Sequence, residues 1–377
     1  MPHHLPHINA RVLTVLVIVS LPLYALAAVM VLGTGQAQLR DSYGLQLTET
    51  AQQVAATVDS YVFRRLIDVT TLTRVPDIQA AAVAGNAVPI DIAKARALDT
   101  AWTAQPGPTA ARSGILDNAA SRFLADIVNN DRIYREILVT DREGRLVAAS
   151  GPTTDYIQSD ENWWKEAFND GVRGRAAVSD VTWDESTKSH AIEIAVPVNE
   201  RPGERLVGVL KVVADVRELL AVAAGVRSGR TGEAFLIRED GSIVISQRGM
   251  AEKAQFFAAD LLRERMKNYK AGDPEFRVNF TARDPAGRSY LVGVAPSQLG
   301  ASYPHLSWMV VVTQAEDDLF APVRAQLWRL LALFGLIAAL VLAIAAWFSF
   351  RLAAPTIEKD MHITEHPEVP RIEEEES

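Results

Sequence analysis

The chain has 377 residues, of which 49% are apolar and 22% are charged, and its formal net charge at pH 7 is -8. This length suits two or three modules, and the negative balance excludes nucleic-acid binding as the main function, because that function needs a basic surface. The sequence contains no cysteine, which excludes disulfides, thiolate metal ligands and cysteine nucleophiles.

Two long apolar segments lie near the ends of the chain. Residues 12–32 and residues 330–350 contain no charged residue, and each is long enough to cross a hydrocarbon core of roughly 30 Å as a helix. Helices of soluble proteins rarely stay apolar on every face over such a length. We therefore expect two transmembrane helices. A cleaved signal peptide is the alternative for the first, although its apolar stretch is longer than usual.

The two spans divide the rest of the chain into three parts. We expect residues 1–11 and 351–377 to be cytoplasmic and residues 33–329 to lie outside the inner (cytoplasmic) membrane, in the periplasm or facing the exterior. The second tail ends in an acidic run and is typical of a disordered segment. It is too short for a kinase or cyclase domain, so the output would belong to a separate kinase, cyclase or chemotaxis protein. A truncated relative of a longer receptor would look the same.

A long helix is predicted after the first span. Apolar residues recur at spacings of three and four within residues 36–78, and residues 45–74 contain no proline or glycine, which favours an amphipathic helix. We expect the part of this helix next to the membrane span to be exposed or to pair with a second copy of the chain, which would make a homodimer. The part further from the span is expected to pack on a sheet.

Two similar β-hairpins follow, with turns at Gly144 and Gly241. Residues 136–150 and 234–246 each read as an apolar run, a turn and a second apolar run. Each hairpin precedes a helical stretch, expected near 163–168 and 250–269. Strands are expected at 176–183, 189–198 and 206–216, and again at 276–282, 289–296 and 307–314. The fold class is therefore α+β, with two tandem antiparallel-sheet modules.

We place a membrane-distal module at about residues 79–220 and a membrane-proximal module at about residues 221–325. The most informative segments are YIQSDENWWKEAF (156–168), AIEIAVPV (191–198), LVGVLKVVADV (206–216), TGEAFLIREDGSIV (231–244), GRSYLVGVAP (287–296) and YPHLSWMVVVTQ (303–314). Their order and spacing resemble the double Cache domain, the PAS-like extracytoplasmic sensor region of bacterial chemoreceptors, sensor kinases and cyclic-dinucleotide enzymes. The resemblance covers roughly residues 36–325.

The resemblance implies a small-molecule ligand in the membrane-distal module. Amino-acid-binding members carry a tyrosine, four residues, an arginine, one residue, a tryptophan and a second aromatic. Tyr156 and Trp163 match this pattern, Trp164 replaces the second aromatic, and Glu161 stands where the arginine would be. A glutamate there would repel the carboxylate that an arginine clamps. The family's aspartate for the amino group would fall near Val213, and Asp215 lies two residues further on.

The candidate ligand-binding residues are Tyr156, Asp160, Glu161, Trp163, Trp164, Trp183 and Asp184. Aromatic faces and carboxylates together favour a primary or quaternary amine. Each type of residue also has a structural interpretation. One tryptophan would lie in the core and one would cap the sheet. Asp160 would be the N-cap of a helix starting near Asn162, with Glu161 at its positive end. Asp184 would form the tip of a hairpin.

We expect no metal, no cofactor and no enzyme activity. His362 and His366 have helical spacing but precede a proline, and Asp155, Asp160 and Glu161 lack the spacing of a calcium loop. Nucleophile and phosphate-loop motifs are absent from the sequence. The best interpretation is a membrane-anchored sensor of a small solute, and the alternative is a cell-envelope scaffold that uses its modules for protein contacts without a small ligand.

Overall fold

The structure is a computed structural model. It describes residues 10–89, 91–104, 110–184, 187–202, 204–226, 229–250, 254–269 and 278–353. The chain divides into two compact units. One is built from the two ends of the chain, up to Leu39 and from Phe320 on, and the other comprises Arg40–Leu319.

The terminal unit contains the start of helix α1 (Ala10–Leu72) and helix α11 (Ala321–Ala353). Ala321–Ile344 is long and apolar enough to span a membrane, and none of it is buried. It is the one such helix among the described residues, and it begins before the expected span at residues 330–350. Residues 12–32 are helical within α1, but most of their side chains lie outside the part that the structure describes. The first expected span therefore stays a prediction.

Helix α1 ends earlier than predicted. Its last residue is Leu72 rather than about residue 78, because Pro76 begins a separate helix, α2 (Pro76–Ala87). Proline suits the first turn of a helix, where its missing N–H is not needed. Val75, before it, is extended at φ -68° and ψ 125°, as expected for a residue preceding proline.

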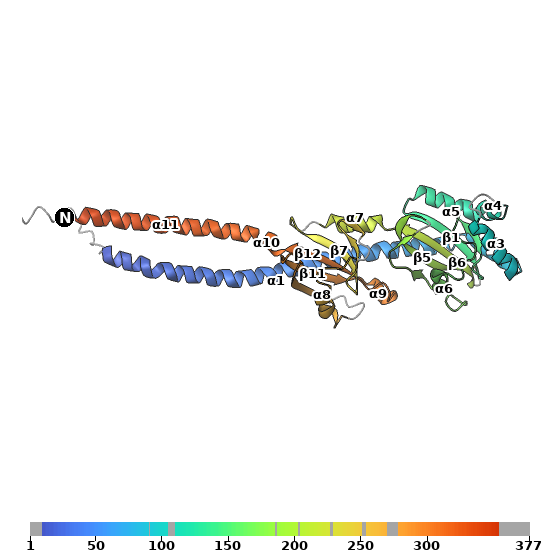
Figure 1. The fold of residues 1–377 in the computed structure, drawn as a ribbon, viewed down its shortest axis with the longest axis horizontal. Coiled ribbons are helices and arrows are strands. Elements are labelled where there is room, and N and C mark those ends of the chain that lie inside the picture. The colour runs from blue at the N-terminus through green and yellow to red at the C-terminus, as the bar shows by residue number, and fades with distance from the viewer. Residues whose placement is uncertain are drawn as a thin grey trace, which may run out of the picture. The chain divides into compact units, whose positions relative to one another are not determined.

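The first module contains a six-stranded antiparallel sheet in the order β2-β1-β6-β5-β3, with β4 also paired to β5 (Figure 1). Its strands are β1 (Tyr134–Asp141), β2 (Leu146–Ala149), β3 (Ala177–Val178), β4 (Thr182–Asp184), β5 (Ser189–Glu200) and β6 (Arg205–Asp215). Its other helices are α3 (Ile92–Ala104), α4 (Ala110–Leu116), α5 (Ala119–Asn130) and α6 (Asn162–Phe168), while α7 (Arg217–Gly225) follows β6 and packs against the sheet of the second module. The single strand expected at 176–183 is therefore two short strands.

The second module repeats this order as β9-β8-β7-β12-β11-β10. Its strands are β7 (Glu233–Arg238), β8 (Ile243–Ser246), β9 (Gly249–Met250), β10 (Val278–Arg283), β11 (Ser289–Pro296) and β12 (Trp308–Ala315), and its helices are α8 (Ala259–Met266), α9 (Leu299–Ser302) and α10 (Glu316–Leu319). Gly144 and Gly241 occupy equivalent turns with φ of 77° and 82°, which glycine adopts without strain. The tandem repeat is confirmed, while the helix expected at 250–269 is shorter.

Helix α1 contacts both sheets. The Tyr61 hydroxyl donates a 2.6 Å hydrogen bond to the backbone oxygen of Asp215 in the first module. The Asp59 carboxylate accepts hydrogen bonds from the Ser297 hydroxyl and the Gln298 amide in the second. Burial raises the pKa of Asp59, although these hydrogen bonds oppose the shift.

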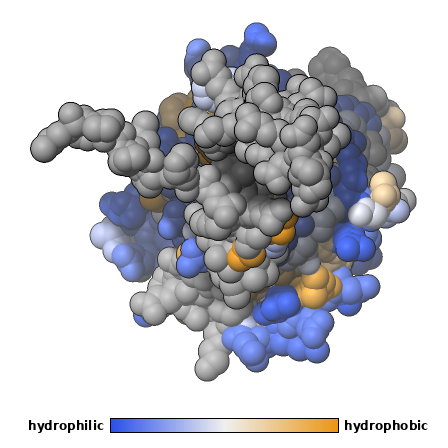
Figure 2. Space-filling view, turned by 90° about the vertical axis from the view of Figure 1, so that its left-hand side faces the viewer, coloured by the Kyte–Doolittle hydropathy of each residue, from blue (hydrophilic) through white to orange (hydrophobic). Residues whose placement is uncertain are grey.

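Where residues are coloured in Figure 2, most are hydrophilic and the hydrophobic areas are small, which is typical of a water-facing surface.

The closest approach of α1 to the second sheet depends on a glycine. A Cβ at Gly293 of β11 would lie 2.4 Å from backbone atoms of Leu47 and Thr48 in α1. We expect Gly293→Ala to lower the free energy of unfolding by about 2 kcal/mol or more, because a packed helix backbone cannot yield easily. Urea unfolding measures this. Gly114→Ala, with no atom within 4 Å of the added Cβ, is the control and should be neutral or slightly stabilising; equal effects of the two would contradict the prediction.

Candidate functional site

The segment Tyr156–Trp164 lies between β2 and α6 and is bonded back onto the first hairpin. The Leu146 amide donates to the Tyr156 oxygen at 2.9 Å, and the Gln158 amide donates to the Gly144 oxygen at 2.8 Å. A Cβ at Gly144 would meet backbone and side-chain atoms of Ser159 at 2.6 Å. The glycine turn therefore fixes the loop closely against the sheet, and α6 begins at Asn162.

Both tryptophans of α6 are buried. Trp163 is 6% exposed and Trp164 is 7% exposed, so the core position expected for one of them holds for both. Trp164 stacks on Phe168 with ring centroids 4.4 Å apart, and its indole N–H donates to the Thr140 hydroxyl at 3.0 Å. Trp163 belongs to the same hydrophobic cluster. Trp164 is thus satisfied by the protein itself, while the ring of Trp163 faces a charge.

That charge is the ammonium of Lys211, in the middle of β6. Its Nζ lies 5.1 Å from the centroid of the Trp163 ring, 3.0 Å from a carboxylate oxygen of Glu193 and 3.7 Å from one of Glu136. The lysine is 7% exposed. A buried cation with this geometry is stabilised by the ring face and by charge-assisted hydrogen bonding.

The strand register explains why these groups meet. Glu136 of β1 and Glu193 of β5 are both paired with Val213 of β6, and Lys211 is two residues before Val213. Residues two apart on a strand share a face, so the three charged side chains lie on one face of the sheet. Asp184 reaches this face from β4, since it pairs with Ser189, and its charge raises the pKa of Glu136.

We call this group the Lys211 cluster (Lys211, Glu136, Glu193), and it contains more carboxylates than ammonium groups. Desolvation alone would lower the pKa of Lys211, but the carboxylates of Glu193 and Glu136 outweigh it and the pKa is raised. Burial raises the pKa of Glu136 despite Lys211. The lysine therefore stays charged, and two carboxylates share one ammonium.

Glu161 adds a third carboxylate to this environment. It is the N-cap residue of α6, and its side chain makes no capping hydrogen bond; the interpretation of Asp160 as the N-cap is therefore wrong. Partial burial raises the pKa of Glu161, and Asp160, Glu193 and Asp155 raise it further while Lys211 lowers it. Asp160 itself is exposed, and its backbone oxygen accepts a hydrogen bond from Lys165.

The remaining candidates are distributed over both faces of the sheet. Tyr156 is half-buried, with its ring centroid 5.8 Å from that of Trp102, and burial raises its pKa. Trp183 pairs with His190, which points to the face opposite Glu193. It is 43% exposed and meets the His190 ring edge-on at 5.0 Å. The structure thus separates Trp183 from the other aromatics. The Asp184 carboxylate accepts hydrogen bonds from Thr187.

Sequence reasoning missed the Lys211 cluster and Trp102. A signal for the cluster was present, because Lys211 and Glu193 lie within apolar stretches of β6 and β5, whose other charged residues are at the strand ends. No signal pointed to Trp102, because α3 is distant in sequence from the segment Tyr156–Trp164. The Trp102 indole N–H donates to the backbone oxygen of Thr153 at 3.1 Å. Asp215 forms ion pairs with Arg135 and Arg217, at 2.5 Å and 3.0 Å, rather than with Lys211.

Metal ligands do not gather in the described part of the chain. Its residues contain no group of three or more His, Asp or Glu side chains placed to hold a metal. Asp155, Asp160 and Glu161 therefore do not form such a group. His362 and His366 lie outside the described residues.

Comparison with known proteins defines the class. A Cache-domain family model matches residues 35–323, so the chain belongs to the double Cache family of sensor domains. Among curated protein sequences, none matches this chain significantly.

Several solved structures are similar to this chain. The sensory domain of the Campylobacter jejuni chemoreceptor Tlp3 (CcmL) matches with a TM-score of 0.51 and 13% identity, covering 75% of this chain and 98% of that one. The ligand-binding domain of Campylobacter jejuni Tlp3 in complex with L-norvaline matches with a TM-score of 0.50 and 13% identity, covering 75% of this chain and 94% of that one. The ligand-binding domain of the Pseudomonas aeruginosa PAO1 amino acid chemoreceptor PctC in complex with GABA matches with a TM-score of 0.47 and 17% identity, covering 72% of this chain and 100% of that one.

The buried ammonium makes a testable contribution to stability. Lys211→Met should lower the free energy of unfolding by about 3 kcal/mol at neutral pH, because it leaves two partly buried carboxylates without their cation. Lys165→Met, at an exposed lysine of α6, should change it by less than about 0.5 kcal/mol.

The pH dependence gives a second readout of the same variant. The pKa of Glu136 is already raised in the folded protein, and loss of Lys211 raises it further. The folded variant then binds more protons than the unfolded chain, so its stability should recover as pH falls from about 8 to about 5. Urea unfolding across this range measures it; a deficit that stays constant with pH would contradict the role of Lys211.

Proposed function

We propose that this chain is a membrane-anchored extracytoplasmic sensor that binds a small cationic amine in its membrane-distal module. The observation that carries the proposal is the excess of carboxylates near Trp163: Glu136 and Glu193 both lie within 4 Å of the single ammonium of Lys211, and Glu161 also feels its charge. Burial and, after it, repulsion from Asp160 raise the pKa of Glu161, and an additional cation at this position would oppose both effects.

Glu161 is the residue best suited to meet the ligand. Its side chain is exposed and does not cap α6, so binding a ligand ammonium would break no described contact. Tyr156 is half-buried and packs against the hydrophobic cluster that contains Trp163, so its ring offers aromatic surface. The proposed contacts are therefore a carboxylate–ammonium hydrogen bond from Glu161, with aromatic packing from Tyr156 and Trp163. Asp160 and Asp184 would add negative potential without direct contact.

The remaining parts of the proposal concern signalling. Ligand binding would favour one of two states of the sensor region, and the change would pass through two membrane helices, at residues 12–32 and 330–350, to a separate kinase, cyclase or chemotaxis protein. The apolar helix Ala321–Ile344 supports the second anchor. A homodimer, joined along the lower part of α1, would be the signalling form.

One observation favours the alternative of a scaffold without a ligand. Lys211 already lies on the face of Trp163, and both tryptophans of α6 are buried among side chains. An internal cation that fills the aromatic site would leave no room for an external one. Ligand binding therefore has to be tested before signalling.

A thermal-shift screen at millimolar concentrations, with primary and quaternary amines, amino acids, organic acids and nucleobases, separates the two functions. An amine at a hundred times its Kd should stabilise the protein by about 2.7 kcal/mol. Stabilisation by carboxylates but not by amines would reverse the charge assigned to the site. An unmoved melting temperature for every class would favour the scaffold.

The contact with Glu161 is tested by substitution. Glu161→Gln should weaken amine binding about tenfold, since it removes a charge-assisted hydrogen bond, and Glu161→Arg should abolish it, both with unchanged folding. Glu166→Gln, at another exposed acid of α6, is the matched control and should bind as the wild type does. Calorimetric titration measures the affinities, and equal losses for Glu161→Gln and Glu166→Gln would refute a specific contact.

Binding should also weaken in acid. The pKa of Glu161 lies above its ordinary value of 4.5, and only its ionised form attracts an ammonium. As pH falls, protonation of Glu161 therefore reduces the affinity before an ordinary carboxyl would titrate. The Glu161→Gln variant should lose this pH dependence in the same titration.

A further inference from the structure

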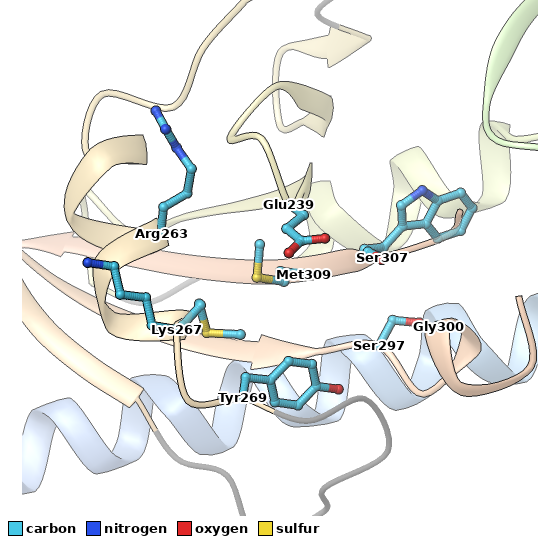
Figure 3. Close-up of a pocket in the computed structure, with 10 residues that line it drawn as sticks. Glu239, Arg263, Lys267, Tyr269, Ser297, Gly300, Ser307 and Met309 are labelled. Atoms are coloured by element: carbon cyan, nitrogen blue, oxygen red, sulfur yellow. The ribbon is translucent and has the colours of Figure 1, made fainter. Parts of the chain in front are cut away.

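The membrane-proximal module contains a cavity of about 400 Å³ beneath α8 (Figure 3). It is bounded by α8, the β7–β8 turn, the β11–α9 turn and the start of β12. Cavities of about 300 to 1,000 Å³ hold small organic molecules. The size therefore suits a ligand of modest dimensions, at a place distinct from the Lys211 cluster.

The surface that lines the cavity is mainly apolar. Met266 at the end of α8 and Met309 on β12 contribute thioether side chains, and Tyr269 and Trp308 contribute aromatic rings. Trp308 is 1% exposed and Met309 is 3% exposed, so the inner wall is firmly packed. Methionine and aromatic side chains pack well against an apolar body and against the methyl or methylene groups next to an ammonium.

Three charged residues line the cavity, Glu239, Arg263 and Lys267. Figure 3 shows the Glu239 carboxylate extending over Met309, while the charged ends of Arg263 and Lys267 point away from it. The Arg263 guanidinium forms an ion pair with Asp260 on the same helix. Within the described part of the chain, no hydrogen bond or ion pair engages the Glu239 carboxylate. A ligand group that pairs with Glu239 must be a cation or a strong hydrogen-bond donor.

The walls of this cavity also fasten the module to its surroundings. The Ser297 hydroxyl on one wall is bonded to Asp59 of α1. The Trp308 indole N–H donates to the Asp180 carboxylate of the first module at 3.0 Å, and Arg238, adjacent to Glu239, pairs with the same carboxylate. A molecule in the cavity would therefore touch the residues that hold both α1 and the membrane-distal module.

We propose that the membrane-proximal module has its own binding site for a small organic ammonium compound with an apolar body, with Glu239 as its counter-ion and Met266, Met309 and Tyr269 as its apolar wall. The site differs from the one proposed in the membrane-distal module in position and residues. Occupancy would bear on Ser297 and Trp308, and so on the attachment of the module to α1 and to Asp180.

The six methionines of the chain make the site directly observable. The full chain, labelled with ¹³C at the methionine methyl groups and purified in a non-ionic detergent, is titrated with phenylethylammonium and followed by NMR. The methyl signals of Met266 and Met309, assigned by Met→Leu substitution, should shift with saturation, and that of Met250 on β9 should move little. No shift up to 10 mM, or shifts that exclude Met266 and Met309, would overturn the proposal.

Charge substitutions test the counter-ion. Glu239→Gln should weaken binding at Met266 and Met309 about tenfold. Glu264→Gln, at an exposed acid of α8 outside the lining, is the matched control and should leave it unchanged. Phenylacetate, an anion of similar shape, should bind at least tenfold more weakly than phenylethylammonium. Equal affinity for Glu239→Gln and wild type, or stronger binding of phenylacetate, would overturn the assignment.

The two proposed sites fail independently. Glu161→Gln should leave the Met266 and Met309 titration unchanged, because that residue belongs to the membrane-distal module. Loss of the titration in Glu161→Gln would show that the signals report distal binding and would overturn a separate proximal site. Amine binding without any response of these methyl groups would support the distal function alone.

Discussion

The packing of α1 against both sheets is the constraint on which the sensor region depends. The backbone of this one helix at Leu47 and Thr48 contacts Gly293 of β11. Further along the helix, Asp59 is bonded to the β11–α9 turn and Tyr61 to the end of β6. Each contact needs a particular partner: no side chain at Gly293, a hydroxyl at Ser297 and a backbone oxygen at Asp215. Because all three lie on one rigid element, a shift of either module relative to α1 must break hydrogen bonds or backbone contacts.

The fold was largely predictable because it depends on local patterns. Alternating apolar residues and glycine turns at Gly144 and Gly241 specify two hairpins, and their repetition indicates two similar sheets. The errors occur where tertiary context decides. Pro76 ends α1 but could equally have begun a kink, and the short strands β3 and β4 are defined by pairing with β5 rather than by their own residues.

The candidate site was predicted only in part, for a physical reason. Tyr156, Glu161 and the tryptophans are adjacent in sequence, so a motif reveals them together. Glu136, Glu193 and Lys211 come from three strands, and only the register of the sheet brings them to one face. A lone lysine in an apolar strand signals burial with a partner, but the identity of that partner depends on pairings that a single sequence does not contain.

The internal ammonium changes the meaning of the aromatic residues. A tryptophan beside carboxylates suggests an empty cation site, yet Lys211 occupies the ring face of Trp163. The lysine supplies one positive charge to the two carboxylates of Glu136 and Glu193, so carboxylates remain in excess around it. The same strand that carries Lys211 ends at Asp215, whose backbone oxygen accepts the hydrogen bond of Tyr61. Strand β6 therefore carries the Lys211 cluster in its middle and is bonded to α1 at its end. A change in the contacts of Lys211 acts on a strand that α1 holds directly, so the cluster and the helix are joined without a long relay.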